Sequence, residues 1–305
     1  MIQRHRTAIA LLLAAGLIFA VGAIRSSGQA DPHLAETFLA KKLLWHRQFD
    51  VVVAGDSRVY RGVCPSVMKP LLLAQRIANF GFSGCGLTAP YLKALEQLLD
   101  PQASQPVIIL GVTAQSLSPV AARENEFLEL HRLSRLELLE MATIGHLAHF
   151  CRPFEEQDIR GLLGKQPAEY SATWHPDGWV ASRKIPEDPL EAVRKYRERV
   201  SKAMVKRQVS DEIVDQLLDT VRQWRERGIL VYGFRPPTPK QMVELENTLM
   251  GFDEPTFVQQ FEDAGGLWLT VGGNERYHSY DGSHLREDAA IAFSRDLALV
   301  IQQAN

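Results

Sequence analysis

Ser57 is the residue whose type and position first suggest chemistry in this chain of 305 residues. It lies in the segment Gly55–Arg58, directly behind the apolar run Val51–Ala54, which predicts a buried strand. A serine hydroxyl becomes a nucleophile when a neighbouring base removes its proton. Far downstream, Asp281 and His284 supply a carboxylate and an imidazole three residues apart. Serine, histidine and aspartate are the groups that acyl transfer uses, so this hypothesis requires the distant segments to meet.

Each of these segments also has a purely structural interpretation. A serine behind a strand often serves as a turn or N-cap residue, which would explain Ser57 without any chemistry. Asp281 can likewise cap a following helix, with His284 on the surface. The functional interpretation therefore depends on several segments considered together.

Further polar and glycine-rich segments follow the other predicted strands. The turn 79–86 is dense in glycine, which lets a backbone approach a ligand closely because no Cβ intervenes. Thr113 and Gln115 follow the third strand and offer polar donors at the same sheet edge. Arg235 follows the fourth strand and Arg58 adjoins the serine, so both are candidates for binding substrate, together with Gln115.

The order of the predicted elements indicates how these segments are brought to one place. Strands alternate with helices along the first part of the chain, which predicts an α/β fold with a central parallel sheet and helices on both faces. In such sheets, ligands bind outside the carboxyl ends of the strands. The main predicted strands are 50–54, a short strand before 79, 106–111, 228–234 and 267–270.

A long segment between the third and fourth strands breaks this alternation. From about 120 to 227 the patterns are mostly helical, around an irregular piece at 174–179. We therefore predict one domain over 31–305 that carries a helical insertion, and a separate N-terminal segment over 1–30.

The first thirty residues have the pattern of an export signal. Basic residues at positions 4–6 precede an uncharged run from Thr7 to Ile24. The run is long enough to cross a bilayer as one helix, and we expect an uncleaved transmembrane anchor. One alternative is a cleaved signal peptide, for which the small residues at 28–30 offer a cleavage site. The other is an ordinary buried helix. Positive charge ahead of the run predicts that residues 31–305 are anchored to the membrane on its outer side, in the periplasm or the extracellular space. If the segment is cleaved instead, the protein would be secreted.

Composition excludes some functions and leaves others open. The net charge is −2 with both signs interspersed, so no basic surface for nucleic acid is predicted. Three scattered cysteines predict neither a disulfide framework nor a zinc site. His146 and His149 have a spacing that metal sites use, but no partner ligand is evident, and we expect no metal. The oligomeric state is not predicted.

Together, the segments resemble the signature blocks of the SGNH hydrolases, the GDSL lipase and esterase superfamily. Gly55–Ser57 is similar to the first block, which contains the nucleophilic serine. Segment 79–84 resembles the second, which would make Gly84 the oxyanion-hole glycine. Segment 281–284 is similar to the last, in which Asp281 and His284 complete the triad with Ser57. The resemblance covers most of 48–117 and 228–300 and implies a flavodoxin-like three-layer sandwich.

Two positions depart from the pattern of that superfamily. Arg58 stands where the lipase-like members usually carry leucine. The third block should bring an asparagine that donates to the oxyanion, but alignment places Thr113 there, with Gln115 as another candidate donor. Loss of one such donor typically slows catalysis about a hundredfold or more.

The resemblance implies a serine esterase or O-acyltransferase that uses no metal or organic cofactor. Membrane-tethered relatives transfer or remove acyl groups on cell-surface polysaccharides. The expected substrate is therefore an acylated carbohydrate or another small ester of the cell envelope or the extracellular space. The alternative is a catalytically weak binding or assembly protein of the envelope, which the missing asparagine favours.

Overall fold

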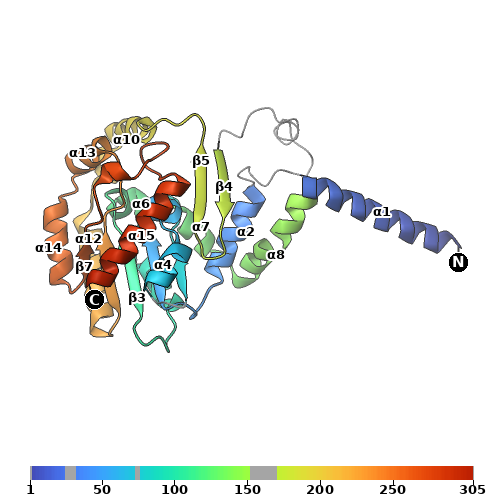
Figure 1. Ribbon diagram of the computed structural model, residues 1–305, viewed down its shortest axis with the longest axis horizontal. Helices are drawn as coiled ribbons and strands as arrows, with labels where there is room; N and C mark the ends of the chain where they lie inside the picture. The colour runs from blue at the N-terminus through green and yellow to red at the C-terminus, as the bar shows by residue number, and fades with distance from the viewer. Residues whose placement is uncertain (1, 25–31, 73–75, 152–169, 305) are drawn as a thin grey trace.

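The computed structural model describes residues 2–24, 32–72, 76–151 and 170–304 (Figure 1). A five-stranded sheet with the order β2-β1-β3-β6-β7 forms its centre, and every neighbouring pair is parallel. This is the flavodoxin-like order, and the predicted parallel α/β sheet is confirmed. The strands are β1 (Val51–Gly55), β2 (Ile77–Asn79), β3 (Val107–Gly111), β6 (Leu230–Phe234) and β7 (Leu267–Leu269).

The central strands are buried on both faces because their side chains are apolar at every position. In β1, Val52 and Ala54 join one core cluster, whereas Val51 and Val53 join the other on the opposite face. One face is covered by α5 (Ala89–Leu98), α12 (Asp211–Glu226), α13 (Lys240–Thr248) and α14 (Glu254–Asp263). The other is covered by α3 (Ser57–Gly62), α4 (Pro65–Leu72) and α15 (Glu287–Ala304). The result is the expected three-layer sandwich.

The insertion between β3 and β6 is only partly as expected. It contains η1 (Gln115–Leu117) and the predicted helices, namely α6 (Pro119–Arg123), α7 (Glu126–His131), α8 (Arg135–Cys151), α10 (Glu191–Lys202) and α11 (Met204–Arg207). It also contains an antiparallel hairpin that we did not predict, formed by β4 (Tyr170–Trp174) and β5 (Val180–Lys184). Gly178 makes the hairpin turn possible, because its φ of +92° is accessible mainly to glycine.

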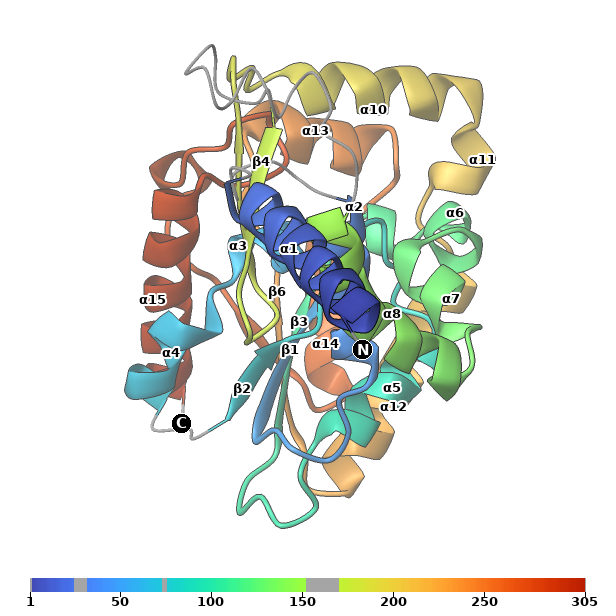
Figure 2. The same cartoon turned by 90° about the vertical axis from the view of Figure 1, so that its right-hand side faces the viewer.

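The last helices of the insertion lie where the strands of the sheet end. Figure 2 shows α10 across one end of the molecule, next to α13, with α11 following it. Helix α12, which we had assigned to the insertion, instead packs on the sheet through a stripe of apolar side chains from Ile213 to Trp224. The insertion therefore covers the end of the sheet rather than forming a separate body.

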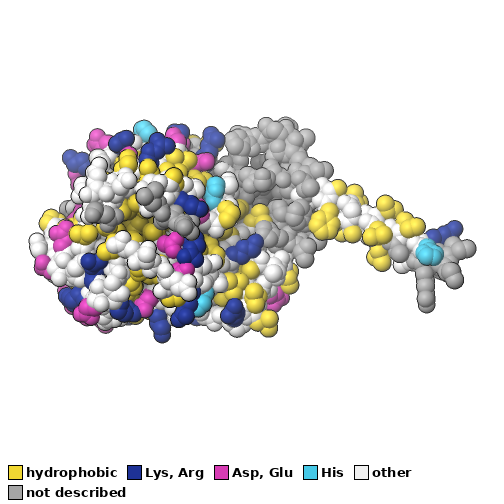
Figure 3. All heavy atoms as spheres, turned by 60° about the horizontal axis from the view of Figure 1, so that its bottom comes forward, with side chains coloured by type: hydrophobic (Ala, Val, Ile, Leu, Met, Phe, Trp, Pro, Cys, Tyr) yellow, Lys and Arg dark blue, Asp and Glu magenta, His cyan; other side chains and the backbone are white. Residues whose placement is uncertain are grey.

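The N-terminal segment is helical, as predicted, but the transmembrane span predicted for it is not found in the described residues. Helix α1 (Ile2–Ile24) extends away from the sandwich (Figure 1), and hydrophobic side chains lie along it (Figure 3). Helix α2 (Pro32–Leu43) follows and packs against α8. Among the residues that the structure describes, no helix is both long and apolar enough to cross a membrane.

Candidate active site

Ser57 begins helix α3 at the carboxyl end of β1. The preceding Asp56 caps this helix, because its Oδ1 accepts a hydrogen bond of 2.9 Å from the Arg58 N–H. Gly55 makes the tight turn possible, since a Cβ there would lie only 2.7 Å from the carbonyl oxygen of Gly111. The strand, the glycine and the cap together present the serine hydroxyl at the edge of the sheet.

The structure brings Ser57, His284 and Asp281 into one hydrogen-bonded chain. His284 Nε2 lies 2.8 Å from Ser57 Oγ, across 227 residues of sequence. On the other side of the ring, His284 Nδ1 lies 2.7 Å from Asp281 Oδ2. If Nδ1 carries the ring proton and donates it to the carboxylate, Nε2 is left to accept the proton of the serine hydroxyl. This is the geometry that a general base and its orienting carboxylate require.

Asp281 both caps the local turn and orients the histidine. Its Oδ1 accepts the backbone N–H groups of Ser283 and His284 at 2.9 and 2.8 Å, while its Oδ2 faces the imidazole. Gly282 lies between them at φ +86°. The capping interpretation and the functional interpretation of this segment are therefore compatible, because each uses a different carboxylate oxygen.

The environment favours a neutral imidazole beside an ionised carboxylate. Burial lowers the pKa of His284, and the positive charge of Arg61 lowers it further, against the effect of Asp281. Burial acts to raise the pKa of Asp281, but the hydrogen bond and charge of His284 and the backbone donors hold it well below its usual range. At neutral pH the histidine is thus ready to accept a proton.

Two backbone N–H groups are available beside the serine. Ser57 and Gly84 line the same cavity, and within the described residues neither N–H donates a hydrogen bond. Gly84 adopts φ +65°, a conformation that favours glycine, with open space where a side chain would stand. These two N–H groups can donate hydrogen bonds to the carbonyl oxygen of an ester attacked by Ser57, and so stabilise the negative charge that develops on it.

The loop that carries Gly84 is held in place by a buried lysine. Lys42 of α2 is fully buried and donates a hydrogen bond of 2.6 Å to the carbonyl of Gly81. Its ammonium also lies over the rings of Tyr60 and Phe82. Burial lowers the pKa of Lys42 to about 7, although the charge of Glu126 partly opposes this.

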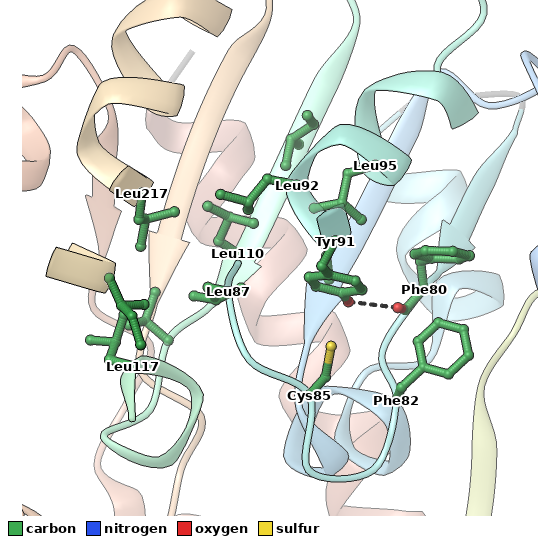
Figure 4. Close-up of a cluster of buried hydrophobic side chains, with 14 of the residues drawn as sticks. Phe80, Phe82, Cys85, Leu87, Tyr91, Leu92, Leu95, Leu110, Leu117 and Leu217 are labelled. Carbon is green, nitrogen blue, oxygen red and sulfur yellow. Dashed lines mark hydrogen bonds between the residues drawn. The ribbon is translucent and has the colours of Figure 1, made fainter. Parts of the chain in front are cut away.

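Tyr91 also holds this loop in place, through a hydrogen bond. Figure 4 shows its ring among Phe80, Phe82 and Leu95, with the hydroxyl directed at the carbonyl of Phe80. That hydrogen bond measures 2.7 Å, and the same oxygen accepts the N–H of Gly55 at 3.0 Å. The turn before Ser57 and the loop before Gly84 are thereby tied together.

Thr113 does not supply the oxyanion donor that we expected. It is fully buried, it does not line the cavity, and its hydroxyl donates its only proton to Asp56 Oδ2 at 2.7 Å. Thr113 therefore orients the helix cap. Gln115, in contrast, does line the cavity, and its Oε1 is buried without a hydrogen-bond partner among the described residues. Of the third segment, it is therefore Gln115 and not Thr113 that faces the cavity.

The expectation that Arg58 and Arg235 bind substrate is also wrong. Both guanidinium groups are buried against Glu246, at 2.6 Å from Arg58 and 2.7 Å from Arg235. Arg58 further donates to Ser283 Oγ at 3.1 Å, and Arg235 pairs with Glu254 at 2.5 Å. Neither arginine lines the cavity. Each charge is needed inside the protein to neutralise a buried carboxylate.

The cavity over the serine has a volume of about 290 Å³ and includes side chains that we did not predict. They come from the last helices of the insertion, and four of them are charged: Glu191, Lys195, Arg199 and Arg207. The first three recur every fourth residue, which places them on one face of α10. That spacing is visible in the sequence, but nothing local indicates that this face turns toward Ser57.

No metal assignment follows from the site. Within the described ranges, no three histidine, cysteine or carboxylate side chains cluster as metal ligands. The side chains of His146 and His149 lie outside the described part of the chain. The chemistry available to this cavity from the chain itself is nucleophilic attack by Ser57 with proton transfer through His284.

Comparison with known proteins adds little to this geometry. No protein family matches the sequence, and no curated protein matches it either. Among solved structures, a carbohydrate acetylesterase family member from Sinorhizobium meliloti is similar, with 13% sequence identity and a TM-score of 0.37, over 83% of this chain and 98% of that chain. A similarity of this extent does not indicate which reaction the chain catalyses, so the functional conclusion depends on the site itself.

Proposed function

We propose that this protein is a serine esterase or O-acyltransferase of the SGNH type. The observation that supports this most directly is the chain of hydrogen bonds from Ser57 Oγ through His284 to Asp281, at 2.8 and 2.7 Å. The position of Ser57 at the carboxyl edge of a flavodoxin-like sheet agrees with it. So do the two available N–H groups in the same cavity.

The proposed reaction transfers an acyl group through the serine. As Ser57 Oγ attacks an ester carbonyl, His284 Nε2 takes the hydroxyl proton, and the N–H groups of Ser57 and Gly84 stabilise the oxyanion. His284 then gives the proton to the leaving alkoxide, and an acyl-enzyme remains. Water, or the hydroxyl of an acceptor sugar, attacks the acyl-enzyme with His284 again as base. Asp281 keeps the imidazole oriented and stabilises its protonated form.

We further propose that the substrate is an acylated carbohydrate. Polar and charged side chains contribute most of the cavity lining, which suits a hydroxyl-rich ligand better than an acyl chain of a lipid. The unpartnered Oε1 of Gln115 can accept a hydrogen bond from a sugar hydroxyl. The choice between water and a sugar as acyl acceptor decides between an esterase and a transferase.

We also propose that the catalytic domain acts outside the cytoplasm. The basic start, the uncharged run from Thr7 to Ile24 and the exposed leucines of α1 support an export segment at residues 1–30. Fractionation of cells that express the full chain, beside a variant with Leu12→Arg and Leu13→Arg, tests this. Retention of both proteins in the cytoplasm would contradict export.

The serine is tested by comparing the full chain with Ser57→Ala and with Ser66→Ala as a matched control. Ser66 is exposed near the start of the next helix, α4. With 4-nitrophenyl acetate, Ser57→Ala should lose about a thousandfold or more in kcat, whereas Ser66→Ala should retain the wild-type rate. Equal rates for wild type and Ser57→Ala would contradict the proposal.

A second readout covers a transferase that hydrolyses slowly. A fluorophosphonate probe should add its mass to wild type and Ser66→Ala at Ser57, and should not add to Ser57→Ala. Because the hydroxyl of Thr113 is committed to Asp56, a catalytically weak binding protein is the second candidate function. Absence of both turnover and labelling in wild type would favour that candidate.

A further inference from the structure

The cavity over Ser57 contains an excess of positive charge on the side formed by the insertion. Helix α10 brings Lys195 and Arg199 to the lining, and α11 brings Arg207. Among the described residues, Glu191 is the only carboxylate that these two helices contribute to the cavity lining. This side faces the triad across the same space of about 290 Å³.

The carboxylates that line the cavity already have donors of their own. Glu191 accepts from Lys184 and from Lys195, each at 2.5 Å, so Lys195 is also paired. Asp281 is bound to His284 at 2.7 Å. Asp56 accepts the hydroxyl of Thr113 at 2.7 Å and the N–H of Arg58 at 2.9 Å. The donors to Asp56 and Asp281 are neutral, but among the described residues none of the three carboxylates forms an ion pair with Arg199 or Arg207.

Arg199 and Arg207 are the two cations of the lining that lack such a partner. Neither forms an ion pair with a carboxylate of the described residues. In addition, the Nε of Arg207 is buried and has no hydrogen-bond acceptor in the part of the chain that the structure describes. A buried N–H group without an acceptor is unfavourable, and a ligand that brings an acceptor removes that penalty.

We infer that the substrate carries an anionic group, a carboxylate or a phosphate, close to the ester, and that Arg199 and Arg207 bind it. This inference rests on the proposed function, since it concerns the substrate of the same cavity. Guanidinium groups bind carboxylate and phosphate through paired N–H donors, which adds geometric selectivity to the charge. The cavity is small for a ligand site, so the anion and the ester belong to the same sugar or to adjacent sugars.

The kinetic test compares matched neutral and anionic esters. An O-acetylated oligouronide is assayed beside the same oligomer with methyl-esterified carboxylates, and an acetylated sugar phosphate is assayed beside the acetylated sugar. Arg199→Gln and Arg207→Gln should each lower the ratio of kcat/KM for the anionic over the neutral ester at least tenfold. Arg197→Gln is the matched control, because Arg197 is exposed on α10 and does not line the cavity; it should keep the wild-type ratio. A ratio that is the same in all four proteins would overturn the inference.

A binding measurement separates this inference from the proposed function. Calorimetry with Ser57→Ala and the non-acetylated oligouronide needs no turnover. Adding Arg199→Gln or Arg207→Gln should weaken binding at least tenfold, and the methyl-esterified oligomer should bind correspondingly less well. If wild type turns over no ester but binding still depends on these arginines, the proposed function fails and the inference stands. If charged and neutral oligomers bind alike to all variants, the inference fails even where turnover is found.

Discussion

The buried hydroxyl of Tyr91 accepts the N–H of Gly55 at 3.0 Å, two residues before Ser57. The same hydroxyl donates its proton to the carbonyl of Phe80 at 2.7 Å, in the loop that leads to Gly84. One side chain of α5 therefore sets the spacing between the nucleophile turn and the proposed oxyanion loop. The distance between the serine and the N–H of Gly84 depends on a contact that takes no direct part in the reaction.

Tyr91→Phe should consequently impair both stability and turnover. The substitution leaves the N–H of Gly55 and the carbonyl of Phe80 without their partner in a buried site, which costs about 1–3 kcal/mol. We expect kcat to fall about tenfold or more with a smaller change in KM, because the oxyanion donors shift relative to Ser57. Denaturant unfolding and steady-state kinetics measure the two effects. Tyr277→Phe is the control, because the hydroxyl of Tyr277 donates to Asp296 away from the cavity. An equal loss of kcat in Tyr277→Phe would contradict the positioning role of Tyr91.

The buried ammonium of Lys42 should make stability depend on pH above neutrality. In the unfolded chain lysine keeps its proton up to a pKa of about 10.5, but in the folded protein the pKa is about 7. Between these values the unfolded state binds more protons, so stability rises with pH, by at most about 1.4 kcal/mol per pH unit. Lys42→Met should lack this rise. Urea unfolding from pH 7 to 10 tests it, and parallel curves for the two proteins would show that Lys42 is not the cause.

The rate of ester turnover should fall at acid pH through protonation of His284. A neutral imidazole is needed as base, and burial and Arg61 lower its pKa. The acid limb of kcat/KM should therefore lie below the ordinary histidine value near 6.5, with a plateau at neutral pH. Arg61→Gln removes the positive charge and should move this limb upward, on the order of half a pH unit. Arg76→Gln, an exposed arginine that pairs with Asp50 and Asp100, should leave the limb in place; equal limbs in all three proteins would exclude the effect of Arg61.

Glu246 should be essential for stability because it is a fully buried carboxylate between two buried guanidinium groups. Its charge is retained in the interior: burial acts to raise the pKa of Glu246, but Arg58 and Arg235 hold it below its usual value. Glu246→Gln leaves Arg58 without its buried charged partner and leaves Arg235 paired only with Glu254, which we expect to cost about 3–5 kcal/mol. Glu244→Gln, on the exposed side of the same helix, is the control. Equal midpoints of thermal unfolding for the two variants would refute this role.

Much of the fold could be predicted from the sequence because it depends on neighbours along the chain. The valines of β1 and the apolar runs of β3 and β6 indicate buried strands without any knowledge of what covers them. Their alternation with helices predicts the parallel sheet, and the spacing of Asp281 and His284 predicts that both belong to one turn. The hairpin β4–β5 escaped prediction, since its short strands lie in a region dominated by helical patterns.

The partners of the polar side chains were decided only by the tertiary structure. Arg58 stands beside the nucleophile in sequence, yet its guanidinium lies against Glu246, which is 188 residues away along the chain. Thr113 follows the third strand as the expected oxyanion donor would, but its hydroxyl donates to Asp56 and Thr113 does not line the cavity. Local sequence does not determine which of several possible acceptors a buried donor meets.

The sequence by itself determined the kinds of groups at this site and the elements that carry them: a serine after one strand, a glycine loop after the next, and an aspartate and histidine before the last helix. The tertiary structure decided the distance of 2.8 Å between His284 Nε2 and Ser57 Oγ, and it brought Arg199 and Arg207 of the insertion to the same cavity. The physical reason is that periodicity and capping act over a few residues. Contacts across the cavity, in contrast, depend on how the helical layers pack around the sheet.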